Sequence, residues 1–344
     1  MKTSPFISAL TTGENTTTPV WFMRQAGRSL PEYRATKGNT NILDAIAEPE
    51  LASKITLQPV ERYGVDAAVL YSDIIVPVNS IGFGVDIEAG VGPVTKNPFK
   101  TQSDLARLEG FDANTSTPYV IETIKLLKAK LEVPLIGFAG APFTVASYLI
   151  EGRPTRTFES TKAMMHGNSA TFAALMERLA EITWLSLKGQ IEAGVDAVQI
   201  FDSWVGNLSA YEYDTFVAAH TRSVVEKVRA LGVPIVHFGT NTTHLLKEFA
   251  KIPTDGVSLD HRTSIAEAVE TLGSNRAIQG NLDPILCLTN EGVMLDEAKR
   301  VLLESRATEK YVFNLGHGVL PSTNPQMLEK LVEFVHKNGA ELRA

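Results

Sequence analysis

The chain of 344 residues contains only one cysteine, Cys287. A lone thiol excludes an intramolecular disulfide and any zinc site built from several cysteines. A single free thiol fits a reducing compartment, so we expect a cytoplasmic location. The stretch Phe6–Leu10 is too short and too interrupted to be the apolar core of a signal peptide, and we expect no export.

Excess positive charge is also missing. The chain has 32 lysines and arginines against 39 aspartates and glutamates, a formal net charge of −7. Nucleic acid binding requires a broad basic face, so we expect no nucleic acid partner. If the ligand is an anion, the positive charge that holds it must be local.

Long unbroken hydrophobic runs are absent as well. Residues 133–150 carry no charge, but Pro134, Gly137, Gly140 and Pro142 interrupt them. Prolines and glycines at this spacing break a helix, so the run predicts a buried strand, a loop and the start of a helix. We therefore expect no membrane span.

Short apolar or β-branched segments alternate with amphipathic stretches along the chain. The eight expected strands are Val20–Met23, Ala67–Tyr71, Leu135–Phe138, Ala197–Phe201, Ile235–Phe238, Gly256–Leu259, Ala277–Gln279 and Tyr311–Asn314. The expected helices are Pro49–Tyr63, Tyr119–Leu131, about Ser160 to Ala193, Tyr211–Leu231, His244–Ile252, Ser264–Leu272, Met294–Ser305 and Pro325–Asn338.

This alternation, with no second compositional regime, predicts one α/β domain over residues 1–344 with the (β/α)8 TIM barrel fold. The active site of such a barrel lies at the carboxyl ends of its strands. The segment Val85–Pro98, with Gly90, Gly92 and Pro93, predicts a small β-hairpin inserted after the second strand.

Two arginines stand out in Pro19-Val-Trp-Phe-Met-Arg-Gln-Ala-Gly-Arg28, which is followed by Pro31-Glu-Tyr-Arg34. At four residues apart, Arg24 and Arg28 would repel each other unless an anion lay between them, and a guanidinium is suited to bidentate capture of carboxylates. The pattern indicates an anion clamp. The alternative is a pair of surface arginines held by a local acid such as Glu32.

Polar side chains follow the other expected strands. Asp73 and Asp202 are candidate functional carboxylates, although aspartate is also a common helix N-cap. Ser203 has no Gly-x-Ser-x-Gly elbow around it, which disfavours a serine nucleophile, and Tyr148 could be an ordinary half-buried tyrosine. His317 lies between two glycines, which would let the backbone approach a ligand closely.

Signatures of cofactors are missing. The histidines near the strand ends have no metal-ligand spacing, and no glycine-rich phosphate loop follows a strand. We therefore expect no cofactor and no metal.

Several motifs together resemble the uroporphyrinogen decarboxylase family. They are the arginine segment from Pro19 to Arg34, Tyr71-Ser-Asp73, Gly140-Ala-Pro-Phe-Thr, Phe201-Asp-Ser-Trp and Gly316-His-Gly. The resemblance runs from about Pro19 to the C-terminal helix. It implies a (β/α)8 barrel, commonly a homodimer, that converts the four acetate arms of uroporphyrinogen III to methyl groups in haem biosynthesis without a cofactor.

The resemblance also implies roles for individual residues. Asp73, Arg24 and Arg28 would be catalytic, with Asp73 stabilising the protonated pyrrole and the arginines holding carboxylates. The implied substrate-binding residues are Arg24, Gln25, Ala26, Gly27, Arg28, Asp73, Tyr148, Ser203 and His317.

The family resemblance also bears on three further positions. Phe143 and Phe201 are implied to line the cleft. Lys37 stands where the family pattern leads us to expect an arginine; it keeps the charge but loses the planar fork, so we leave it outside the site. The proton donor stays open, because arginine is a poor acid.

Two other functions remain as alternatives. A zinc-dependent methyltransferase acting on corrinoid proteins or thiols would need histidine and cysteine ligands, and no cysteine accompanies His237. A non-catalytic tetrapyrrole carrier would keep the arginines without needing Asp73.

Overall fold

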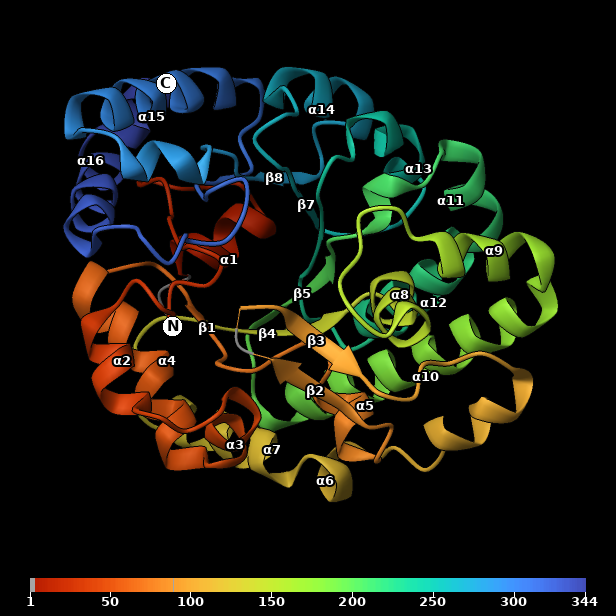
Figure 1. Ribbon diagram of the computed structural model, residues 1–344. Helices are drawn as coiled ribbons and strands as arrows, with labels where there is room; N and C mark the ends of the chain where they lie inside the picture. The colour runs from red at the N-terminus through yellow and green to blue at the C-terminus, as the bar shows by residue number, and fades with distance from the viewer. Residues whose placement is uncertain (1–3, 89) are drawn as a thin grey trace.

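A curled parallel sheet forms the centre of the computed structural model, which describes residues 4–88 and 90–344 (Figure 1). Residues 1–3 of the expected domain and residue 89 of the expected hairpin lie outside the described residues. The order of the sheet, β1-β4-β5-β6-β7-β8-β9, follows the sequence, as right-handed crossovers between parallel neighbours produce. Its strands are β1 (Ala68–Val69), β4 (Leu135–Gly140), β5 (Ala197–Asp202), β6 (Ile235–Gly239), β7 (Gly256–Ser258), β8 (Ala277–Gln279) and β9 (Tyr311–Val312).

Helices surround this sheet on its outer side (Figure 1). The α-helices of the first half are α1 (Pro5–Leu10), α2 (Pro31–Lys37), α3 (Ile42–Ala47), α4 (Pro49–Tyr63), α5 (Val76–Ser80), α6 (Ala113–Ser116), α7 (Pro118–Lys128), α8 (Pro142–Glu151) and α9 (Glu159–Gly167). Those of the second half are α10 (Ser169–Ala193), α11 (Ala210–Phe216), α12 (Ala218–Arg229), α13 (Leu246–Ala250), α14 (Ile265–Leu272), α15 (Glu291–Glu304) and α16 (Pro325–Arg343). Short 3-10 helices are η1 (Gln102–Leu108), η2 (Val205–Asn207), η3 (Thr243–Leu245), η4 (Pro284–Leu288) and η5 (Ser305–Ala307).

The first expected strand, Val20–Met23, is wrong: the described residues form seven strands in this sheet. Val20 makes only an isolated parallel bridge to Phe313. Beyond it, side chains replace the ladder, because the Phe22 N–H donates to Gln25 Oε1 at 3.0 Å and the Met23 N–H donates to Asn314 Oδ1 at 3.3 Å. The chain therefore turns away from the sheet one residue before Arg24.

Two long helices expected from periodicity are each divided in the structure. The stretch from Ser160 to Ala193 breaks at Asn168, which has φ −142° and ψ 58°, into α9 and α10. The stretch Tyr211–Leu231 breaks at Val217 into α11 and α12. The apolar period continues across both breaks, so hydrophobicity alone does not reveal the change of direction.

The segment after β1 contains the antiparallel pair β2 (Val85–Glu88) and β3 (Gly92–Thr95). Val85 pairs with Thr95 and Glu88 pairs with Gly92, on either side of the undescribed residue 89. Pro93 of β3 lines the cavity described below. This pair therefore covers part of the rim of the sheet.

Polar side chains cross the interior of the curled sheet. Gln279 accepts from Trp21 Nε1 and donates to Gln199 Oε1 and Ser258 Oγ, each at 2.9 Å. All four side chains are buried, so hydrogen bonding offsets the cost of removing them from water. Among the described residues, no helix is long and apolar enough to cross a membrane.

Candidate active site

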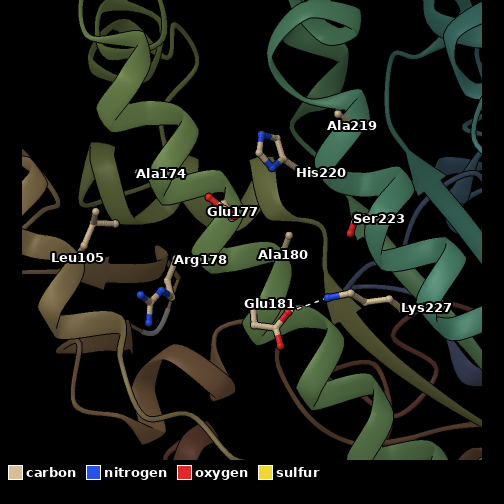
Figure 2. Close-up of a pocket in the computed structure, with 10 residues that line it drawn as sticks. All are labelled: Leu105, Ala174, Glu177, Arg178, Ala180, Glu181, Ala219, His220, Ser223 and Lys227. Atoms are coloured by element: carbon tan, nitrogen blue, oxygen red, sulfur yellow. Dashed lines mark hydrogen bonds and ion pairs between the residues drawn. The ribbon is translucent and has the colours of Figure 1, made fainter.

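Two cavities of the described structure are large enough to hold a ligand. The larger, about 640 Å³, lies on the outside of the molecule between α10, α12 and η1 (Figure 2). Two of its charged side chains pair with each other, because Lys227 Nζ lies 2.8 Å from the Glu181 carboxylate. The smaller, about 290 Å³, opens at the carboxyl ends of β1, β4, β5 and β6, where barrel enzymes place their chemistry. The smaller cavity is therefore the candidate active site.

The cavity brings together side chains from widely separated segments. Its lining consists of Met23, Arg24, Ala26, Val69, Leu70, Tyr71, Ser72, Asp73, Ile74, Pro93, Phe138, Tyr148, Phe201, Ser203, Trp204, Phe238, Thr240, His317 and Gly318.

Arg24 occupies a left-handed backbone conformation, with φ 58°. A non-glycine residue in this region carries local strain, which the surrounding structure must overcome. Two glycines make room for it: a Cβ on Gly27 would lie 2.9 Å from the Arg24 carbonyl oxygen, and one on Gly318 would lie 2.5 Å from Arg24 Cδ. The turn thus directs the Arg24 side chain across the last loop and along the cavity.

Three of the residues that the resemblance implies in substrate binding do not line the cavity. Gln25 is fully buried and supports the turn, accepting from Phe22 N–H and donating to the Ala67 carbonyl at 3.0 Å. Gly27 packs against the Arg24 backbone as described above. The exposed Arg28 uses its carbonyl oxygen to accept from the Arg34 guanidinium. In the described structure, Arg24 is therefore the arginine of the pair that reaches the cavity.

Lys37, which was left outside the site, also lies away from the cavity. Its ammonium group donates to the Thr40 carbonyl at the end of α2.

Asp73 follows β1 at the entry to α5. Its Oδ1 accepts from the Ile75 N–H at 3.1 Å, which fixes the carboxylate while leaving acceptor capacity for a ligand. Burial raises the pKa of Asp73 above its ordinary value, while this backbone contact and the charge of Arg24 act in the opposite direction. A carboxylate in such surroundings gains from any positive charge that enters the cavity.

His317 is held as a neutral donor. Its Nδ1 accepts from the Gly318 N–H at 2.6 Å, so the ring hydrogen is on Nε2. Burial, with the charge of Arg24 next, lowers the pKa of His317 to about 4. At neutral pH the ring therefore offers one N–H to a ligand without adding a charge.

The glycines around His317 were expected to let the backbone approach a ligand. Gly318 lines the cavity and Gly316 does not, and an added side chain at either position would meet protein atoms. A Cβ on Gly316 would lie 2.3 Å from the His261 backbone nitrogen, and Gly318 has Arg24 against it. Both glycines permit close packing between loops.

Tyr148 and Ser203 both line the cavity, from α8 and from the end of β5. The Tyr148 ring packs edge-on against Trp204, with centroids 5.7 Å apart. Burial raises the pKa of Tyr148 to about 12, so its hydroxyl stays protonated. Ala26 also lines the cavity, beside the Arg24 turn.

Aromatic rings form the apolar wall of the cavity. Phe138, Phe201, Phe238 and His317 follow one another in edge-to-face contacts, with centroid separations of 5.3, 5.7 and 6.1 Å. The expectation that Phe143 lines the cleft is wrong, because this residue is fully buried and absent from the lining. Phe138 takes that place, since it alternates toward the interior from β4.

Asp202 is a structural carboxylate and not a helix cap. It is fully buried, accepts from Thr144 Oγ1 at 2.8 Å and faces His237 Nε2 at 3.4 Å. Thr144 Oγ1 in turn accepts from the Trp204 N–H at 3.3 Å. This chain of contacts positions the loop that carries Ser203 and Trp204.

The arrangement suits an anionic ligand with an electron-rich ring. Arg24 and the neutral donors can hold carboxylates, the phenylalanines can contact a ring, and Asp73 can stabilise positive charge that develops on it. Within residues 4–88 and 90–344, no group of three or more histidine, cysteine, aspartate or glutamate side chains is placed to hold a metal ion.

Sequence comparisons give one consistent result. The family described as uroporphyrinogen decarboxylase (URO-D) matches residues 1–338. The uroporphyrinogen decarboxylase of Salinispora tropica is 48% identical over 342 residues, covering 99% of this chain and 92% of that protein. The same enzyme of Geobacillus kaustophilus is 47% identical over 327 residues, covering 94% of each chain.

Comparison with solved structures supports the fold. A methyltransferase from Methanosarcina mazei aligns with a TM-score of 0.80 and 21% identity, covering 97% of both chains. At this identity the likeness concerns the fold alone.

Proposed function

Because the chain belongs to the uroporphyrinogen decarboxylase family, we propose that it converts the four acetate side chains of uroporphyrinogen III to methyl groups. The products are coproporphyrinogen III and four molecules of CO2, in haem biosynthesis. The observation that carries this proposal is a cavity in which the carboxylate of Asp73 lies with the cationic Arg24 and the neutral donor His317 against an aromatic wall.

Substrate binding requires local positive potential. The substrate carries eight carboxylates and the protein has a net charge of −7, so attraction must come from the cavity. In the proposal, Arg24 forms a charge-assisted contact with a carboxylate arm, and His317 Nε2, Tyr148 and Ser203 donate hydrogen bonds to the arms. Arg28 is exposed outside the cavity lining, and in the proposal its charge contributes to long-range attraction of the substrate.

Decarboxylation requires an electron sink. Protonation of a pyrrole ring carbon creates a cation, and the bond to the departing carboxyl group then breaks with its electrons flowing into the ring. A proton added at the side-chain carbon gives the methyl group, and the ring carbon returns its own proton. One proton is consumed for each CO2 released.

Asp73 is the residue that we assign to the cation. Its carboxylate would accept hydrogen bonds from the pyrrole N–H groups, and the attraction strengthens as the ring becomes positive. A preorganised contact of this kind is worth about 3 kcal/mol of the activation barrier. No cofactor is needed in this scheme, because the substrate ring supplies the sink.

We also propose that the fold is a complete (β/α)8 barrel with a hairpin insertion. We infer that Pro19–Trp21 completes an eight-membered ring, because Val20 bridges Phe313 on one side and its carbonyl accepts from the Asp66 N–H at 2.8 Å on the other. We also infer that β2 and β3 form a hairpin, and that the chain is a single domain with one buried apolar cluster from Phe6 to Val335.

A homodimer is the assembly that we propose. Ile285, Leu288 and Val293 are 57%, 43% and 42% exposed, and they gather in η4 and the start of α15. These elements follow β8 on the cavity side of the sheet, and exposed apolar groups at one place favour association.

The test is an anaerobic turnover assay on the purified chain, with a metal chelator present and no cofactor added. We expect uroporphyrinogen III to give hepta-, hexa-, penta- and tetracarboxylate products. A flat time course with folded protein would refute the decarboxylase. Substrate binding without CO2 release would instead support the tetrapyrrole carrier.

The position of the single cysteine argues against the zinc-dependent methyltransferase. Cys287 is buried outside the cavity, and burial raises the pKa of its thiol to about 12. A thiol of this kind is a poor zinc ligand, since metal binding requires the thiolate.

A further inference from the structure

Two tyrosine hydroxyls meet beside the cavity without a role in the scheme above. Tyr33 of α2 and Tyr71 at the end of β1 lie with their hydroxyl oxygens 3.0 Å apart and their ring centroids 5.8 Å apart. Tyr71 lines the cavity and is partly exposed. Tyr33 is only 5% exposed and does not line it.

Counting the hydroxyl hydrogens of this pair shows which tyrosine can donate a hydrogen bond to a ligand. Each hydroxyl has one hydrogen, and a single hydrogen bond between the two oxygens uses one of them. If Tyr71 donated, the hydrogen of the buried Tyr33 would be left without an acceptor among the described residues, which is unfavourable inside a protein. The favourable arrangement has Tyr33 donating to Tyr71, and the hydrogen of Tyr71 then remains available to the cavity.

The backbone of Tyr71 is also fixed. Its N–H donates to Thr56 Oγ1 at 3.0 Å, and Thr56 Oγ1 donates in turn to the Ala52 carbonyl within α4. The backbone contact with Thr56 and the hydroxyl contact with Tyr33 together fix the position of the Tyr71 hydroxyl, two residues before Asp73. Preorganised donors contribute most to binding because they lose little freedom when the ligand arrives.

We propose that Tyr71 is a further substrate-contacting residue, which donates its hydroxyl hydrogen to a carboxylate arm of the substrate, and that Tyr33 is the positioning residue that aligns it. The inference rests on the proposed function for the identity of the ligand. Burial raises the pKa of Tyr71 well above its ordinary value, so the donor stays protonated at neutral pH.

The experiment compares Tyr71→Phe, Tyr33→Phe and the double variant. Losing one hydrogen bond to a charged group is expected to raise the KM for uroporphyrinogen III about tenfold in Tyr71→Phe. The kcat should stay within about twofold of wild type, because Asp73 and Arg24 are untouched. In Tyr33→Phe the donor remains but is less well aligned, so we expect a KM increase of about threefold.

The double variant tests whether an unpaired Tyr33 hydroxyl, and not the loss of the Tyr71 donor, causes the effect of Tyr71→Phe. It removes both hydroxyls and leaves none unpaired in the interior, so its KM should match that of Tyr71→Phe. The matched control is Tyr211→Phe, which makes the same change at a side chain that is 70% exposed and should leave KM unchanged.

Binding of uroporphyrin III, the oxidised octacarboxylate, separates the two proposals. Its affinity, followed by quenching of tryptophan fluorescence, should fall in Tyr71→Phe even if the wild type shows no turnover, which would refute only the decarboxylase. A KM and an affinity within twofold of wild type in both Tyr71→Phe and the double variant would overturn the role of Tyr71. Equal KM increases in the two single variants would overturn the assignment of donor and positioning residue.

Discussion

At the scale of single residues, the electrostatic character of the cavity depends on a few unlike groups set close together. Arg24 supplies the permanent charge, His317 is kept neutral, and Asp73 keeps a carboxylate in surroundings that disfavour its ionisation. Such a combination attracts carboxylates and still stabilises a cation at one point. Each of the three groups can be tested separately.

Replacing Asp73 by asparagine keeps the shape and removes the charge that would stabilise the ring cation. We expect Asp73→Asn to fold and to lose turnover by about a hundredfold or more, the size of one preorganised electrostatic contact. Steady-state kinetics and circular dichroism measure the two properties. Turnover near that of the wild type would remove Asp73 from the mechanism.

The two arginines should differ in their response to lysine. Arg24→Lys keeps the charge but loses the bidentate fork inside the cavity, and we expect kcat/KM to fall about tenfold to a hundredfold. Arg28→Lys is the matched control outside the cavity, and its effect should be within about threefold. A larger loss for Arg28→Lys would reverse the assignment of these two residues.

His317 should make stability depend on pH. Its pKa is about 4 in the folded protein, below the ordinary value near 6.5. The unfolded chain therefore binds more protons between about pH 6.5 and pH 4, so this residue destabilises the fold as the pH falls through that window.

Urea unfolding at pH 7.5 and pH 5 measures this contribution. Relative to His317→Asn, the wild type should lose about 2 kcal/mol of unfolding free energy between the two pH values. Comparison with the variant cancels the other titrating groups. An identical loss in both proteins would show that His317 titrates normally.

At the scale of elements, the cavity depends on how closely loops pack at the ends of the strands. The loop after β9 passes against the Arg24 turn, where Gly318 permits the close approach, and against His261, where Gly316 permits it. Helix α4 shows the opposite case, where local signals suffice. Its observed bounds, Pro49–Tyr63, equal those predicted, because a proline begins the helix and Gly64, with φ 65°, ends it.

Adding one methyl group to the loop after β9 tests this packing. In Gly318→Ala the new Cβ would lie 2.5 Å from Arg24 Cδ, so the arginine must move. We expect a fall in kcat/KM of about tenfold or more with the fold retained, because small displacements of positioning groups are costly.

A suitable control is Gly167→Ala in α9, where no atom of the described residues would lie within 4 Å of the new Cβ and no cavity residue is involved. It should leave kinetics unchanged. Unchanged kinetics in Gly318→Ala as well would mean that Arg24 tolerates displacement.

At the scale of the whole molecule, we expect the protein to be a homodimer in solution. Light scattering of the purified chain should give twice the mass of 37.4 kDa. Ile285→Asp places a charge among the exposed apolar side chains of η4 and α15, so it should lower the measured mass toward that of the monomer. A wild-type protein that is monomeric at assay concentrations would refute the homodimer.

The sequence by itself determined the features that local patterns encode. Alternating apolar segments predicted the α/β order of the sheet and its helices. The polar residues after those segments included Asp73, Tyr148, Ser203 and His317, all of which line one cavity. Side chains at the ends of parallel strands meet at one edge, so this grouping follows from topology.

The tertiary structure decided what depends on contacts between distant segments. It separated Arg24, which packs against Gly318 and lines the cavity, from Arg28, which does not line it. It placed Phe138 in the wall instead of Phe143, and it gave His317 its neutral form through burial beside Arg24. These outcomes depend on distances between residues almost 300 positions apart, such as Arg24 and Gly318, which a pattern of neighbouring residues does not contain.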